Sequence, residues 1–127
     1  MFEVTVERTF AAGHALREYR GKCENVHGHN YRVEVTVAGD DVDSTGLLVD
    51  FVELKQRLDG VIAYLDHRFI NDLAPFDKIN PSAENIARYF FQEIEKGLAV
   101  RENGPRSRLA RVKIWETDTS SATYQPR

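Results

Sequence analysis

Apolar and polar residues alternate along two stretches in the first third of the chain. In the first ten residues four even-numbered positions are apolar, namely Phe2, Val4, Val6 and Phe10. Between residues 31 and 37 the odd-numbered positions are apolar, namely Tyr31, Val33, Val35 and Val37. A period of two is typical of a strand that buries one face. The pattern therefore predicts two half-buried strands, joined by a loop that begins at residue 11.

The period changes to that of a helix in the middle of the chain. Residues 49–65 carry an apolar stripe at helical spacing, formed by Phe51, Leu54, Leu58, Val61 and Leu65. Asp50 stands at the N-cap position, with Glu53 three residues later as in a capping box. A second helix is predicted to begin after Pro81 and Ser82 and to end near Gly97. Its apolar stripe comprises Ala83, Ile86, Ala87, Phe90 and Ile94.

Two more strands are predicted after the second helix, at residues 109–116 and 122–125, which makes the element order ββααββ. Strands and helices that do not alternate one by one favour an α+β fold with an antiparallel sheet. Two helices cover only one face of such a sheet, and its edge strands need protection. We therefore expect one domain over residues 1–127 and a homo-oligomer.

Composition and charge narrow the functional classes. With 127 residues, 42% of them hydrophobic, and a net charge of −3, the chain resembles a globular protein and not a general nucleic-acid binder. A single cysteine forms no internal disulfide. We see no signal peptide and no apolar run of membrane-spanning length. We expect a cytoplasmic protein with no nucleic-acid or membrane partner.

Three histidines are predicted to share one face of the sheet. His27 and His29 lie two residues apart at the start of the second strand, so their side chains point the same way. His14 has the parity of the apolar face of the first strand, and a hairpin would place it opposite this pair. Three imidazoles that leave a fourth position open suit a catalytic zinc ion. Copper, nickel and iron also accept imidazole ligands.

The sequence leaves open the role of Cys23, four residues before His27. It would serve as a fourth metal ligand in a closed site, as a small buried residue, or as a thiolate base or nucleophile. Asp66 directly precedes His67, and such a pair can orient an imidazole or simply end a helix. Glu116 ends the apolar face of the third predicted strand, where it would bind the N–H edge of a flat heterocycle or an arginine.

Several of these motifs together resemble the 6-pyruvoyl-tetrahydropterin synthase and 6-carboxy-tetrahydropterin synthase family. The most specific is the pattern CxxxHGH, read here as Cys23 to His29. The resemblance continues in order along nearly the whole chain, in GLLVDF (46–51), LDHRFIN (65–71), NPSAEN (80–85) and WET (115–117).

The resemblance implies the tunnelling fold (T-fold), in which ββααββ subunits join their sheets into an oligomeric barrel. It implies a homohexamer built as a dimer of trimers, with active sites between subunits. It also implies zinc ligands at His14, His27 and His29, a catalytic base at Cys23 and an acid/base relay at Asp66 and His67. The pterin anchor would be Glu116, with Thr117 beside it in the substrate site.

The substrate implied by the resemblance is 7,8-dihydroneopterin triphosphate. The bacterial branch converts it to 6-carboxy-tetrahydropterin, acetaldehyde and triphosphate for queuosine synthesis, and this branch is favoured by the short chain. The biopterin branch makes 6-pyruvoyl-tetrahydropterin. A folate-linked branch carries glutamate in ExxHGH, and this chain has both residues as Cys23 and Glu24. Arg17, Arg20, Lys22 and Lys113 are candidate triphosphate contacts. A non-catalytic, zinc-stabilised binding module remains the alternative of another class.

Overall fold

The computed structural model describes residues 1–18, 25–98 and 105–127, and it confirms the α+β order ββααββ. The described residues form four strands and two α-helices. A short 3-10 helix, η2, lies between the two α-helices and was not predicted from the sequence. Their bounds are β1 Phe2–His14, β2 His27–Gly39, α1 Phe51–Leu65, η2 Ile70–Asp72, α2 Ala83–Gly97, β3 Ser107–Thr117 and β4 Ser120–Tyr124.

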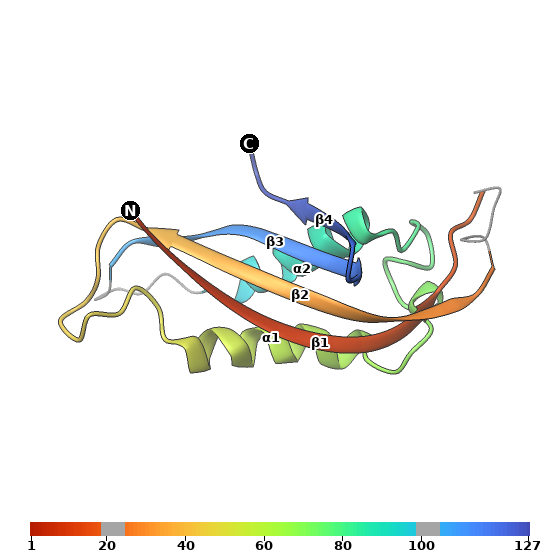
Figure 1. Cartoon of the computed structure of the whole chain (residues 1–127), viewed down its shortest axis with the longest axis horizontal. Coiled ribbons are helices and arrows are strands. Elements are labelled where there is room, and N and C mark those ends of the chain that lie inside the picture. Colours follow the sequence, from red (N-terminus) through yellow and green to blue (C-terminus); the bar gives the residue numbers. More distant parts are fainter. Residues whose placement is uncertain (19–24, 99–104) are drawn as a thin grey trace.

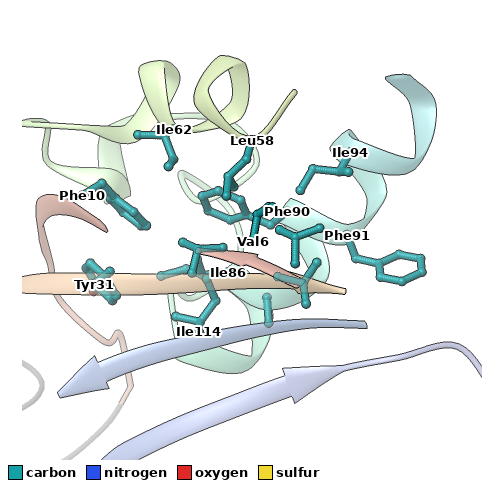
Figure 2. Packing of buried hydrophobic residues seen from close by; sticks show 14 of the residues in the cluster. Val6, Phe10, Tyr31, Leu58, Ile62, Ile86, Phe90, Phe91, Ile94 and Ile114 are labelled. Atoms are coloured by element: carbon teal, nitrogen blue, oxygen red, sulfur yellow. The ribbon is translucent and has the colours of Figure 1, made fainter. Parts of the chain in front are cut away.

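The strands form one antiparallel sheet in the order β1-β2-β3-β4, and both helices cover the same face (Figures 1 and 2). Antiparallel neighbours can be joined by short connections. The connection between β2 and β3 is longer because it contains both helices. The segment between α1 and α2 lies at the end of the sheet where β1 ends and β2 begins (Figure 1). That end of the sheet is where the three histidines lie.

The first strand is longer than predicted, because it runs on to His14 instead of giving way to a loop at residue 11. Residues 11–14 pair with β2 on one side. On the other side Ala11 O accepts a hydrogen bond from His67 N at 2.6 Å, and Gly13 N donates to Arg68 O at 3.0 Å. Backbone pairing on both sides maintains the strand through small residues that carry no strand signal of their own.

The core confirms the predicted parity of the strands except at the start of β1, where Phe2 is 50% exposed and Val4 is only partly buried. Figure 2 shows Val6, Phe10 and Tyr31 of the sheet packed beneath side chains of both helices. The ring of Phe10 stacks on Tyr31 and on Phe90 of α2, with centroids 4.9 and 5.6 Å apart. On the same face, the fully buried residues of β2 and β3 are Tyr31, Val33, Val35, Val112 and Ile114.

Helix α1 begins at its predicted N-cap, where Asp50 Oδ1 accepts a hydrogen bond from Val52 N at 2.8 Å. Its buried face differs by two residues from the prediction, because Ile62 takes the place of Val61 and Phe51 is 55% exposed. Helical side chains lean toward the N-terminus, so a residue in the first turn points past the start of the helix. The buried stripe is therefore Leu54, Leu58, Ile62 and Leu65.

Helix α2 has its predicted bounds, and Ser82 Oγ caps it by accepting from Asn85 N at 3.2 Å. Its buried face includes Phe91 in addition to the expected residues, while Ala83 is only partly buried. Neither this helix nor any other in the described ranges is long and apolar enough to cross a membrane.

We predict that Phe90→Ala lowers the free energy of unfolding by about 3–5 kcal/mol, because a fully buried ring would leave a cavity between α2 and the sheet. Denaturant unfolding at a fixed protein concentration measures the change. Gln92→Ala, on the exposed face of the same helix, should change it by less than about 0.5 kcal/mol. Equal effects of the two substitutions would contradict the packing described above.

Candidate metal centre

The antiparallel register of β1 and β2 brings the three histidines together. His14 pairs directly with His27, and His29 follows on the same face of β2. Their ring centroids lie 4.5–5.0 Å apart. The His14 ring is 1% exposed, so this arrangement forms at the buried end of the apolar face.

Backbone carbonyls fix the tautomers of two of these rings. His14 Nδ1 lies 2.8 Å from Pro81 O, and His27 Nδ1 lies 2.7 Å from Asn25 O. A carbonyl only accepts hydrogen bonds, so each Nδ1 carries a proton, and in a neutral ring Nε2 then bears a lone pair. The two Nε2 atoms are 3.0 Å apart. Two lone pairs at this distance repel each other unless a cation lies between them.

His29 completes the cluster with a nitrogen that has no hydrogen bond. Its Nε2 is buried and unpartnered among the described residues, although the carboxylate of Glu116 lies 3.2 Å away. Burial lowers the pKa of His29 below its usual 6.5, despite the opposing effect of Glu116. The imidazole is therefore neutral near pH 7, which is the form that binds a metal.

The donor set fits a zinc ion. One ligand atom each from His14, His27, His29 and Glu116 lies within 4.8 Å of the others. Imidazole nitrogens with a second ring nitrogen bonded to a backbone carbonyl are the usual ligands of zinc, and the carbonyl holds the ring in place. Glu116 Oε1 is 3.0 Å from His14 Nε2, so the carboxylate belongs to the same cluster.

Asp66 and His67 contact each other, as the relay prediction requires. Asp66 Oδ1 lies 3.0 Å from His67 Nδ1 and also accepts from Ala11 N at 3.0 Å. The hydrogen bond from Ala11 N is the main reason that the pKa of Asp66 is held below its usual value. His67 has a positive φ of 60°, and its side chain is 81% exposed.

His67 lines a solvent-open hollow of about 370 Å³ beside the cluster. The hollow lies over the paired ends of β1 and β2, and His29 is one of its residues. Its full lining is Ala11, Ala12, Gly13, Gly28, His29, Asn30, His67 and Arg68. We refer to this space as the His67–Arg68 hollow.

Two predicted site residues lie away from the cluster or outside the described part of the chain. Thr117 is exposed as the last residue of β3, where its Oγ1 accepts from Thr119 N at 3.3 Å. Cys23 and Glu24 lie outside the described residues. Their proposed roles therefore rest on the sequence alone.

Two asparagines that the sequence reasoning did not single out hold the chain after His14. The side chain of Asn71 bonds both backbone groups of Ala15, at 2.9 and 2.8 Å. Asn80 does the same with Arg17, at 2.8 and 2.9 Å. Asn71 stands in the motif LDHRFIN and Asn80 in NPSAEN, and these motifs were the only signal available for them. They fix the strand end that carries the first histidine.

The fold and the cluster together define a class of protein, namely a T-fold protein with a candidate histidine metal site. The family model described as 6-pyruvoyl tetrahydropterin synthase matches residues 3–127. The chain belongs to this family.

Curated relatives carry two different names within the family. The chain is 35% identical to the 6-carboxy-5,6,7,8-tetrahydropterin synthase of Bacillus subtilis, over 99% of this chain and 86% of that protein. It is also 35% identical to the human 6-pyruvoyl tetrahydrobiopterin synthase, over 83% of this chain and 71% of that protein. Identity alone does not choose between these two names.

Solved structures confirm the T-fold. The 6-pyruvoyl tetrahydropterin synthase of Caenorhabditis elegans superposes with a TM-score of 0.82 at 31% identity, over 100% of this chain and 98% of that one. A Plasmodium vivax 6-pyruvoyl tetrahydropterin synthase superposes with a TM-score of 0.80 at 21% identity, over 98% of this chain and 97% of that one. At such low identity the second similarity shows the fold only.

We predict that His27→Ala sharply lowers the zinc bound per chain, because it removes one of three converging imidazole nitrogens. Metal analysis after dialysis measures the change, and His14→Ala and His29→Ala should behave alike. His67→Ala is the matched control, because its ring lies outside the cluster and its loss should leave the zinc content intact. Full occupancy in the three cluster variants would refute the assignment.

Proposed function

We propose that the protein is a zinc-dependent lyase that converts 7,8-dihydroneopterin triphosphate and water to 6-carboxy-5,6,7,8-tetrahydropterin, acetaldehyde and triphosphate. The observation that carries this proposal is the convergence of three histidine side chains on one point. In two of them the Nδ1 atom is hydrogen-bonded to a backbone carbonyl. Membership of a pterin synthase family and the name of the Bacillus relative support the substrate class and the product.

Zinc would be held by His14, His27 and His29, and as a Lewis acid it would acidify the positions next to the substrate's side-chain hydroxyls. Cys23, as a thiolate, is proposed to remove a proton from that side chain. His67 is proposed to exchange a second proton at Nε2, because its Nδ1 proton is held by Asp66. The exposed ring of His67 in the hollow suits this contact with substrate.

Glu116 is proposed to anchor the pterin ring through its N–H edge, where a carboxylate makes a charge-assisted double contact. Its distance of about 3 Å from two histidines supports a second role, as a fourth metal ligand. Thr117, the next residue, is proposed to contribute to the same substrate site. The two roles of Glu116 predict different behaviour of one variant.

We expect Glu116→Gln to weaken pterin binding by about 2–3 kcal/mol, because the amide offers one acceptor oxygen and an opposing donor. Zinc content should stay unchanged. Fluorescence or calorimetric titration with a pterin, together with metal analysis, gives both quantities. A loss of zinc would assign Glu116 to the metal, and unchanged values of both would exclude the anchor role.

The decisive experiment mixes the zinc-loaded protein with dihydroneopterin triphosphate and identifies the products by mass spectrometry. We expect 6-carboxy-tetrahydropterin and acetaldehyde, whereas 6-pyruvoyl-tetrahydropterin or a folate-type product would assign the chain to another branch. Cys23→Ala should keep its zinc and lose turnover, because it removes the base. Loss of zinc in that variant would indicate a closed structural site, and no turnover by the wild-type protein would favour a binding module.

The folate-linked alternative has its own control in Glu24→Ala. This variant tests whether the second acid of the Cys23-Glu24 pair contributes to product choice. An unchanged product mixture would show that Glu24 has no part in the reaction. A selective loss of one product would support a bifunctional enzyme.

We also propose that the chain works in the cytoplasm as a homo-oligomer, a hexamer made of two trimers. The sheet has two edges, β1 and β4, and an edge strand is a ready template for pairing with another copy. Family membership supports the same arrangement.

A further inference from the structure

We propose that the His67–Arg68 hollow is an anion subsite that receives the triphosphate of the substrate, with Arg68 as its phosphate-binding residue. This inference rests on the proposed function for the identity of the ligand. The subsite itself is argued from the charges, the backbone and the shape of the hollow.

The hollow is built for a negative group. Its lining includes Arg68, whose guanidinium carries a permanent positive charge, and no carboxylate-bearing residue lines it among the described residues. Arg68 is exposed and makes no ion pair or side-chain hydrogen bond with any residue that the structure describes. A guanidinium presents a fork of N–H donors that matches phosphate oxygens, and a triphosphate carries several negative charges.

The candidate phosphate contacts from the sequence that the structure describes are already engaged. The guanidinium of Arg17 donates to the backbone carbonyls of Phe76, Ile79 and Asn71, at 2.7, 3.2 and 3.3 Å. Lys113 Nζ lies over the ring of Trp115, 4.5 Å from its centroid. Arg20 and Lys22 lie outside the described residues. Among the described candidates, Arg68 is the one whose donors remain available.

An unusual backbone conformation places Arg68 at the hollow. Residues 67 and 68 lie in the turn after α1, beside β1, and both line this space. His67 has φ of 60°, in the left-handed region that non-glycine residues rarely adopt. The segment is held there by His67 N bonded to Ala11 O at 2.6 Å and by Arg68 O bonded to Gly13 N at 3.0 Å.

The floor of the hollow leaves room close to the backbone. Gly13 and Gly28 pair with each other across β1 and β2, so neither strand raises a side chain at that point. His29 belongs both to this lining and to the metal cluster. A substrate whose hydroxyls lie at the cluster would therefore have its phosphate chain beside Arg68.

The test is calorimetric titration of the zinc-loaded protein with inorganic tripolyphosphate. Arg68→Ala should weaken binding by roughly ten- to a hundredfold, as expected for loss of one charged hydrogen-bonding group. The matched control is Arg8→Ala, an exposed arginine that pairs with Asp59 on another part of the sheet. Any chelation of zinc by the probe would affect all three proteins equally. Wild-type affinity in Arg68→Ala would overturn the subsite.

A second pair of variants tests the backbone argument. His67→Gly adopts a positive φ at little cost, so tripolyphosphate binding should stay close to that of the wild type although turnover is lost. His67→Val strains this conformation and should weaken binding, because it displaces Arg68. Equal binding by the two variants would refute the placement of Arg68 by the turn.

Kinetics separates this proposal from the proposed function. With dihydroneopterin triphosphate, Arg68→Ala should raise KM much more than it lowers kcat, and it should not alter binding of dihydroneopterin, which has no phosphate. If the wild-type protein binds tripolyphosphate through Arg68 but does not turn over the substrate, the proposed function fails and the subsite stands. If turnover proceeds and KM is unchanged in Arg68→Ala, the subsite alone fails.

Discussion

The antiparallel register between β1 and β2 is the constraint on which the rest of the site depends. Thirteen residue pairs run from Phe2↔Gly39 to His14↔His27. A slip of one residue would move every side chain of a strand to the opposite face. The burial of Tyr31, Val33 and Val35 forbids such a slip, because their hydrophobic stabilisation would be lost. The core therefore sets the face on which the histidines meet.

The turn that begins α2 connects this sheet to the helical layer and to the metal cluster. Pro81 O accepts from His14 Nδ1, while Ser82 Oγ caps the helix. Asn80 binds the backbone of Arg17, and its own carbonyl accepts from Asn85 Nδ2 at 2.9 Å. A buried imidazole needs a partner for its second nitrogen, because an unsatisfied polar group is costly. One short turn thus orients a histidine of the cluster, caps a helix and fixes the chain beyond β1.

Periodicity predicted the features that depend on which face a residue occupies. The alternation of β2 was enough to place His27 and His29 together, and the parity of Glu116 placed its carboxylate on the same apolar face. Contacts between side chains and distant backbone do not produce a periodic sequence pattern. The hydrogen bonds of Asn71 and Asn80 to backbone groups 56 and 63 residues away were therefore not predicted. The extension of β1 through Ala11 and Gly13 was missed for the same reason, because backbone bonds to residues 67 and 68 maintain it.

Asp66 also determines which ring nitrogen of His67 carries the proton. The carboxylate ends α1, accepts a hydrogen bond from the edge of β1 and holds His67 Nδ1. The folded pKa of Asp66 lies below its ordinary value of 3.8, so its contribution to stability is present above that value and is lost as the pH falls through the folded pKa. Asp66 is therefore ionised near pH 7. The carboxylate holds the proton on His67 Nδ1, which leaves Nε2 as the ring nitrogen available to exchange a proton with a substrate in the proposed reaction.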